Sequence, residues 1–555
     1  MKSVERFLVP TLLALLVVQC LLSMRLTSAT FDEPSYLSAG YAALTSGIDL
    51  NPAHPPLMKY LLALPLLMVG SAEVETIPHW DGPLTKPLTF GASFLYENRA
   101  DPDTMLFAAR TAVVAVSLCL GALVWMWSRR LYGPGAALVT LALYVGCPNI
   151  VAHSSLATLD LGVSAGIGAA LYALWRMCTR PTLRTGVWAG LALAAALLIK
   201  ATALVVVMLL PVLLGVTFLR DRRQAPAVPR SRTARRPAPA AVPKDRRLLL
   251  ATLAMVIIAL VAISVAYGPH RFGLAEYVAG LRLGVLERSA FMNRRYQAFC
   301  WGRYSATGFP WYFLAAFLLK TPLPTLLLTL ATLAWLIVRR PRRIFDELFL
   351  GLPIVCLFVA TFAVHDNLGL RYILPVYPLL YVLIGGMTAS AARWTMERVG
   401  TSAWRARLAT AAVIVLAAWH LQAPLSIAPH YLAYFNGLFC GPSDGIRYLD
   451  DSNIDWGQDF KGLARYLREH EIPQIKGLYT PRHLGPYLAR YYGVSLTTLT
   501  LDEVRNPQPG WYAISAHLLQ RPTLTNDPVA LRFDWLDRFT PVERIGYSIY
   551  LYHFD

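Results

Sequence analysis

The sequence predicts a polytopic α-helical membrane protein that carries a small α/β domain at its C-terminal end. The first observation is composition: of the 555 residues, 56% are hydrophobic and only 15% are charged, which is too apolar for a soluble protein. The second is a series of about eleven apolar runs, with basic residues in alternate connecting loops. The third is a change of character near residue 424, after which no apolar run is long enough to span a bilayer. We therefore divide the chain into a membrane module, 1–423, and an outer domain, 424–555.

The apolar runs and the loops between them set the expected topology. A window of about 19 residues gives spans at 8–28, 107–128, 134–150, 156–176, 186–199, 201–219, 248–268, a run ending at Arg339 and Arg340, 347–364, 371–390 and 408–423. The positive-inside rule then places the N-terminus in the cytoplasm and the outer domain outside. The net charge of +18 reports this topology and not binding to nucleic acid. A cleaved signal peptide ending at Thr27-Ser28-Ala29 is disfavoured, because its apolar core is usually only about 7–15 residues.

Three segments between the spans have their own expectations. Residues 29–105 form a long first outer loop, and residues 309–320 are expected to form a helix on the outer surface before the eighth span. The segment 220–247 is rich in Arg, Pro and Ala without apolar periodicity, so it is expected to be a disordered basic cytoplasmic linker. Cys300 and Cys440 both fall on the outer side, and the sequence leaves open whether they pair.

An acidic pair, Asp32 and Glu33, follows the first span directly, so both carboxylates are expected at the outer membrane surface. An amphipathic stretch over 37–44 comes next, and His54 and Lys59 follow it. A carboxylate held at the bilayer surface, with a histidine and a lysine behind it, can act on a lipid-borne substrate.

Several short motifs stand in an order that resembles the membrane glycosyltransferases of the GT-C fold. They are the acidic pair, His54-Pro55-Pro56-Leu57, Thr158 with Asp160, Lys200 between two short spans, Phe317 to Pro322, Leu370 to Pro375 and, above all, Asp451 to Asp459. Within that fold the chain looks most like the protein O-mannosyltransferase and aminoarabinose-lipid A transferase branch, in its bacterial phospholipid-carrier-dependent members. The resemblance implies a GT-C fold and an inverting glycosyltransferase in the inner membrane of a bacterium. Such an enzyme moves a sugar from a polyprenyl-phosphate donor to a hydroxyl of a protein, lipid or glycan at the outer face.

The chemistry of this transfer assigns roles to the candidate residues. The acceptor hydroxyl has a very high pKa, so a carboxylate that takes its proton during bond formation contributes about 10²–10⁴-fold. Asp32 is the expected base, with Glu33 as a helper. The leaving lipid phosphate needs fixed cations, for which the candidates near outer span ends are Arg371 and Lys200 first, then Arg110, Lys59 and Lys320. The expected substrate contacts are His54, Asp160 and His365. No metal is required, although the acids of the 451–459 run can hold a divalent cation.

Each assignment has a structural alternative. Asp32 can cap the helix that begins near Pro34, and Lys200 can extend to the membrane interface. Asp160, just inside a span, can be paired for structural reasons. Three other functions stay open for the whole chain: an oligosaccharide transferase that uses a lipid-linked glycan, a secondary transporter and a nonenzymatic scaffold. A transporter should carry ionisable residues near the membrane midplane and two related halves, and neither is evident.

The outer domain is expected to cover the membrane-face site and to help choose the acceptor. With about 130 residues it is large enough for its own core, and its pattern predicts a helix over 458–470 and strands over 475–479 and 511–515. Its aromatic residues can stack on sugars, although core packing is their commoner use; they are Tyr431, Tyr434, Trp456 and Trp511. We expect its removal to spoil transfer to the natural acceptor while the membrane module still binds the donor.

Overall fold

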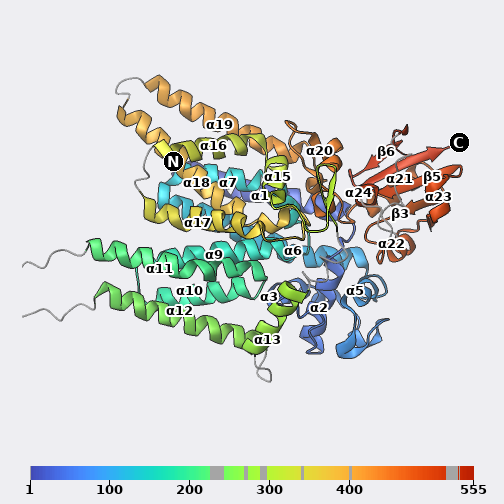
Figure 1. The fold of residues 1–555 in the computed structure, drawn as a ribbon, viewed down its shortest axis with the longest axis horizontal. Coiled ribbons are helices and arrows are strands. Elements are labelled where there is room, and N and C mark those ends of the chain that lie inside the picture. The colour runs from blue at the N-terminus through green and yellow to red at the C-terminus, as the bar shows by residue number, and fades with distance from the viewer. Residues whose placement is uncertain are drawn as a thin grey trace, which may run out of the picture.

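A bundle of long helices forms one end of the molecule, and a smaller domain built around a sheet forms the other (Figure 1). The computed structural model describes residues 2–224, 243–267, 273–287, 297–338, 343–398, 403–520, 536 and 538–555. Most of the linker expected over 220–247 lies outside these residues.

Each expected span falls on a helix of the bundle. These helices are α1 (Lys2–Leu26), α6 (Pro102–Tyr132), α7 (Pro134–Val145), α9 (Asp160–Thr179), α10 (Leu183–Leu197), α11 (Leu204–Gln224), α12 (Lys244–Ala266), α16 (Leu323–Val338), α17 (Ile344–Thr361), α18 (Val376–Arg398) and α19 (Ala403–Leu425). Among the described residues, six helices are long and apolar enough to cross a membrane, or up to eight if each of two bent pairs is one span. The chain is therefore a multi-pass membrane protein, and the full count of about eleven spans stays a prediction.

Two of the apolar helices are sharply bent. α7 meets α8 (Pro148–Ser154) at 64°, and α15 (Tyr312–Lys320) meets α16 at 118°. Proline fits the first turn of a helix but cannot continue the helix before it, and Pro148 begins α8. The helix expected on the outer surface over 309–320 is α15. Its aromatic residues Tyr312 and Phe313 are buried, whereas Leu314 and Leu318 are exposed. One face of this helix therefore packs inside the molecule, and its expected place at the outer membrane surface stays a prediction.

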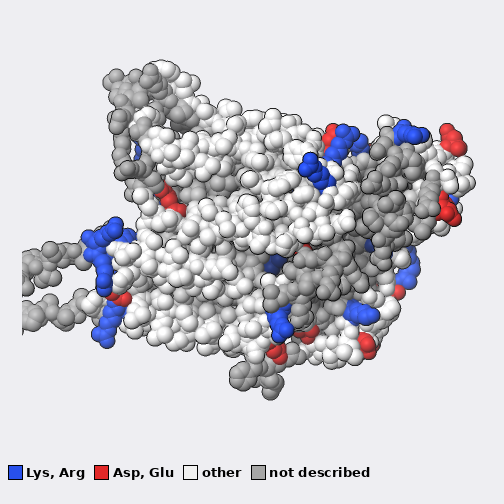
Figure 2. All heavy atoms as spheres, in the orientation of Figure 1, with Lys and Arg blue, Asp and Glu red and all other residues white. Residues whose placement is uncertain are grey.

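Charged side chains gather towards the two ends of the molecule and leave the flank of the bundle largely uncharged (Figure 2). At the end away from the outer domain, α11 and α12 expose Arg222, Arg223 and Lys244. The flank of α12 exposes large apolar residues such as Ile257 and Leu260. The basic end is the one that the positive-inside rule assigns to the cytoplasm.

The first outer loop is mostly helical. It contains α2 (Glu33–Thr45), α3 (Pro56–Ala63), α4 (Leu66–Val69) and α5 (Pro87–Tyr96). The amphipathic stretch expected after the acidic pair is helix α2. Between α12 and α15 lie α13 (Gly273–Leu281) and an antiparallel hairpin of β1 (Ala298–Cys300) and β2 (Arg303–Ser305), which the sequence pattern did not predict. Cys300 and Cys440 are both free.

The outer domain has a five-stranded mixed sheet in the order β4-β3-β5-β7-β6. Strand β3 pairs in parallel with β4 and β5, whereas β7 pairs antiparallel with β5 and β6. The strands are β3 (Ile475–Leu478), β4 (Leu496–Thr498), β5 (Gly510–Ser515), β6 (Glu543–Ile545) and β7 (Ile549–Phe554), and the helices are α20 (Gly441–Asp444), α21 (Phe460–Glu469), α22 (Gly485–Tyr492), α23 (Leu501–Arg505) and α24 (Ala516–Gln520). The expected helix and both expected strands are confirmed as α21, β3 and β5.

Polar contacts join the outer domain to the first outer loop and to the start of α6. Lys461 donates to Asp103 at 2.6 Å, and Arg490 donates to Glu97 at 2.8 Å. Tyr491 donates its hydroxyl to Asp101 at 2.5 Å. The outer domain is thus seated on the part of the chain that carries the acidic pair.

Candidate active site

Asp32 lies at the N-terminal end of α2, yet its side chain makes no capping hydrogen bond there. Instead, its Oδ2 accepts a hydrogen bond from Nη1 of Arg371 at 2.8 Å. The structure therefore does not use this carboxylate as the helix cap that was its structural alternative.

Arg371 comes from the short helix η5 (Leu370–Ile373) that precedes α18. The same Nη1 atom lies 3.8 Å from Oδ2 of Asp160, the first residue of α9. The guanidinium stacks on the ring of Trp456 at 4.2 Å. Its Nε is buried and has no hydrogen-bond partner among the residues that the structure describes.

Lys200 completes the group. Its Nζ donates to Oδ1 of Asp160 at 2.6 Å and lies 5.1 Å from the centre of the Tyr372 ring. Asp32, Asp160, Lys200 and Arg371, which we call the charged cluster, thus come together from four separate parts of the chain. Asp32 and Lys200 keep 13% and 16% of their side chains exposed, against 2% for Asp160. The atoms that an incoming substrate can reach are therefore those of the base candidate and of one cation.

Glu33 and Arg110 form a second ion pair that is completely buried, with Nε of Arg110 2.7 Å from Oε1 of Glu33. Glu33 also accepts from the backbone N–H groups of Thr30 and Ala157. Burial alone would raise the pKa of Glu33, but Arg110 and these N–H groups hold it below its ordinary value. A buried carboxylate stabilised as an anion is a poor proton acceptor, and the structure favours a structural role for Glu33.

Arg110 uses all of its side-chain nitrogens inside the protein. Besides Glu33, its partners are the backbone carbonyls of Met24, Thr27 and Ser28 and the hydroxyl of Thr27. These partners lie at the C-terminal end of α1 and in the stretch that leads from it to Asp32. Arg110 is therefore placed to hold that stretch, and it has no exposed atom to offer a phosphate.

Two of the proposed cations are likewise buried and engaged. Lys59 donates to Oδ1 of Asp49 at 2.5 Å and to the carbonyl of Asn51 at 2.8 Å. Lys320 donates to the carbonyl of Leu432 at 2.8 Å and to that of Asn453. Both lysines fix neighbouring loops in this structure, which does not bring them into the charged cluster.

The two remaining histidine candidates lie in loops. His54 packs edge-on against the ring of Tyr36, with 5.5 Å between centroids. His365 is exposed, and its Nδ1 is hydrogen-bonded with the carbonyl of Thr307. A role for either in substrate binding stays a prediction.

Residues of the outer domain reach the cluster in a way that the sequence did not predict. The ring of Trp456 stacks against the guanidinium of Arg371. The ring of His153 contacts Trp456 edge-on, with 6.2 Å between the ring centroids. The ring of His483 contacts Phe31, the neighbour of Asp32, at 5.1 Å. Burial lowers the pKa of His483 although Asp32 opposes the shift, so this ring is neutral at physiological pH. The 451–459 motif includes Trp456, but nothing in the sequence indicated that this ring would contact Arg371.

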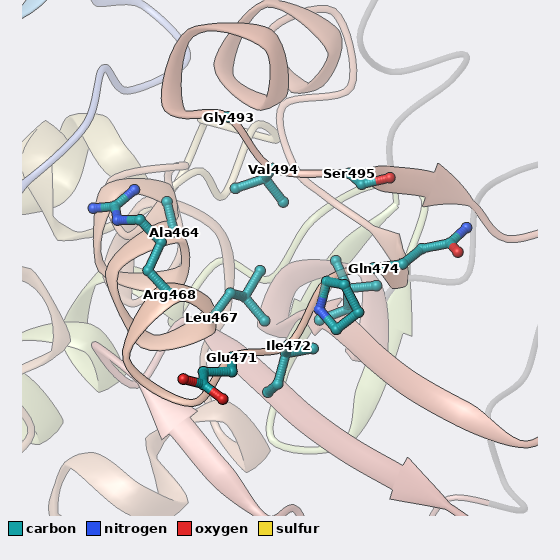
Figure 3. Close-up of a pocket in the computed structure, with 11 residues that line it drawn as sticks. Ala464, Leu467, Arg468, Glu471, Ile472, Gln474, Gly493, Val494 and Ser495 are labelled. Atoms are coloured by element: carbon teal, nitrogen blue, oxygen red, sulfur yellow. The ribbon is translucent and has the colours of Figure 1, made fainter.

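The carboxylates of the 451–459 run accept hydrogen bonds from other groups of the protein. Asp455 accepts from the backbone N–H of His517 at 2.9 Å, and Asp459 accepts from the hydroxyl of Ser548 at 2.6 Å. Among the described residues, no group of three or more His, Cys, Asp or Glu side chains is arranged to hold a metal ion. A separate pocket opens on the outer domain between α21 and the starts of β3 and β4 (Figure 3). Arg468, Glu471, Gln474 and Ser495 supply its polar side chains, and it contains no residue of the charged cluster.

A family model described as dolichyl-phosphate-mannose-protein mannosyltransferase matches residues 103–226. The matched stretch contains Asp160 and Lys200 of the charged cluster. This match confirms the resemblance to GT-C glycosyltransferases that the sequence motifs indicated. Among curated proteins, none matches the chain.

Solved structures of membrane glycosyltransferases are similar to the chain at low identity. ArnT from Cupriavidus metallidurans bound to undecaprenyl phosphate has 16% identity and a TM-score of 0.44, with 98% of this chain and 97% of that chain covered. Its apo state has 14% identity and a TM-score of 0.45, with 99% and 98% covered. The Archaeoglobus fulgidus oligosaccharyltransferase tethered with an acceptor peptide has 13% identity and a TM-score of 0.42, with 87% and 58% covered. At these values the likeness does not bear on the reaction of this chain.

Proposed function

We propose that the chain is an inverting glycosyltransferase that moves a sugar from a polyprenyl-phosphate donor to an acceptor hydroxyl at the outer membrane face. The observation that carries this proposal is the pairing of Asp32 with Arg371 at 2.8 Å, beside Asp160 and Lys200. A partly exposed carboxylate and two cations are the groups that the reaction needs. The matched family model adds support, because its description names a polyprenol-linked sugar.

The proposed step transfers one proton and one glycosyl group. As the acceptor oxygen bonds to the anomeric carbon, Asp32 takes the hydroxyl proton. The bond from that carbon to the phosphate oxygen breaks, and its electron pair leaves with the polyprenyl phosphate. Arg371 and Lys200 meet the growing negative charge. Lys200, with 16% of its side chain exposed, is the more accessible of the two cations, and Arg371 keeps 8% of its side chain exposed beside it.

Purified protein supplied with a radiolabelled polyprenyl-phosphate sugar and an acceptor extract tests the reaction. We expect release of polyprenyl phosphate, and we expect EDTA to leave turnover intact. Asp32→Asn should lower kcat by about 10²–10⁴-fold while donor binding changes little, because a base acts in the transition state. Asp81→Asn, an exposed acid of the same outer loop, is the matched control and should behave like wild type.

The outcomes separate the alternatives. Wild-type turnover in Asp32→Asn would mean that Asp32 is not the base. Loss of turnover with EDTA, restored by a divalent cation, would instead favour an oligosaccharide transferase with a metal. Transport of the lipid-linked sugar without any cleavage would point to a transporter. The sugar and the acceptor would follow from comparing the envelope glycans of a deletion strain with those of its parent.

A further inference from the structure

The 451–459 run of the outer domain contacts both of the loops that supply the pair Asp32 and Arg371. The charged cluster draws these two residues from segments far apart in sequence, and their separation must be set by something that contacts both segments. The run does so through hydrogen bonds of its backbone and of its short polar side chains.

On the Arg371 side, Asn453 and Ser452 hold the chain just before the arginine. Oδ1 of Asn453 accepts from the backbone N–H of Leu370 at 3.0 Å. The hydroxyl of Ser452 donates to the carbonyl of Leu368. Between them, Gly369 has a φ of +123°, and a Cβ there would collide with Ser452, so this close contact requires glycine.

On the Asp32 side, the run binds the stretch that leads into α2. The N–H of Phe31 donates to the carbonyl of Trp456 at 3.0 Å, and the N–H of Ser28 donates to the carbonyl of Gln458 at 2.8 Å. The hydroxyl of Ser28 also donates to the carbonyl of Gly457 at 3.1 Å. Asp32 therefore follows directly after a segment fixed by the outer domain.

The run is itself anchored to the membrane module. The side-chain amide of Asn453 donates to the hydroxyl of Tyr312 on α15 at 2.7 Å, and the buried Lys320 donates to the backbone carbonyl of Asn453. Within the run, Gln458 accepts from the N–H of Trp456 at 2.9 Å and donates to the carbonyl of Ile454 at 2.9 Å. These internal bonds make the run a rigid spacer between its two contacts.

We propose that the 451–459 run sets the separation of Asp32 and Arg371, with Asn453 as its principal positioning residue. Asn453 touches neither reacting group. It acts through the backbone of Leu370 and through the anchor on α15, and Lys320 acts through Asn453. This inference rests on the proposed function for its catalytic consequence, whereas its structural content is independent of the reaction.

Hydrogen exchange of the full-length protein in detergent, read on peptides that cover 28–33 and 366–372, tests the positioning directly. In Asn453→Ala we expect faster exchange in both segments, although Asn453 contacts only the second. Turnover should fall by about 10²-fold, the effect of a misplacement near 1 Å, with the KM for the donor changed much less than kcat. Ser452→Ala removes only the hydrogen bond to the carbonyl of Leu368 and should show the same changes to a smaller extent. It is the variant to measure if Asn453→Ala does not fold.

Gln474→Ala is the matched control, because this exposed amide of the outer domain contacts Thr497 and neither loop. It should leave exchange and turnover unchanged. Unchanged exchange in 28–33 in both test variants would overturn the inference, as would an equal increase across the whole outer domain. If the wild-type protein transfers no sugar, the proposed function fails, and the exchange measurement still decides whether the run holds the two loops.

Discussion

Replacing Arg110 with methionine tests whether this residue is a structural anchor or a donor-phosphate ligand. The substitution keeps an apolar side chain of similar length but removes two hydrogen bonds of 2.7 Å to Glu33, which stays buried. It also removes the weaker hydrogen bonds to Met24, Thr27 and Ser28, which are not counted below. Charge-assisted hydrogen bonds contribute about 1.5–3 kcal/mol each, so the two together predict roughly 3–6 kcal/mol. Breaking a buried ion pair by removing one partner costs about 3–5 kcal/mol, a range that overlaps the sum from the two hydrogen bonds. We expect a destabilisation of about 4 kcal/mol.

Denaturant unfolding of the purified protein in detergent measures this loss. Arg99→Met, an exposed arginine of the same outer segment, is the control and should unfold like wild type. The double variant Glu33→Gln with Arg110→Met should recover much of the stability, because it no longer buries an unpaired charge. An Arg110→Met protein with wild-type stability and weakened binding of polyprenyl phosphate would refute the structural role.

Three further predictions concern other groups. Lys200→Ala should weaken donor binding by about tenfold to a hundredfold in a flotation assay with polyprenyl-phosphate vesicles, and unchanged binding would remove Lys200 from the phosphate site. Burial raises the pKa of Asp455 to about 6, so the folded outer domain binds this proton more tightly than the unfolded chain, and stability from this group falls as the pH rises from about 4 to 6. The unfolding midpoint of Asp455→Asn should lack this fall, and identical pH profiles for variant and wild type would contradict it. Single-cysteine variants in intact cells should react with an impermeant label within 460–520 and not at residue 230, and the reverse pattern would overturn the orientation.

The helical bundle could be predicted from sequence because its signal is local. Apolar runs of the required length alternate with basic loops, and each run falls on a helix. The same holds for α21 and for β3 and β5, where the spacing of apolar residues is read over a few positions. The hairpin of β1 and β2 was missed because its strands have only three residues each, too few for an alternating pattern.

The candidate site was predictable only in part. Asp32, Asp160, Lys200 and Arg371 were recognisable as charges at span ends, which are costly unless they are paired or used. Arg110, Lys59 and Lys320 carry the same signal, yet the structure gives them buried partners. The partner of Arg110 is a carboxylate 77 residues away, and Lys320 donates to backbone carbonyls 112 and 133 residues away. Lys59 has nearer partners, the carboxylate of Asp49 and the carbonyl of Asn51. Such pairings depend on how helices pack, and no local pattern reveals them.

The expectation that the outer domain can be removed without disturbing the donor site stays a prediction, and two contacts argue against it. Trp456 of that domain stacks on Arg371, and the run around it holds the loops on both sides of the charged cluster. If the proposed function holds, the outer domain and the charged cluster act as one framework, so point variants in the outer domain are better probes than its deletion.

The hydrogen bond from Ser28 to Gly457 has a consequence for biosynthesis. It joins residues 429 positions apart, so Asp32 emerges from the ribosome long before the segment that fixes it. At roughly 5–20 residues per second, the delay is about 20–90 s. During that time the stretch that leads to Asp32 lacks its hydrogen bonds to the 451–459 run. Under the proposed function, the charged cluster therefore reaches its final arrangement only after the segment that contains Gly457 has been made and has folded against Ser28.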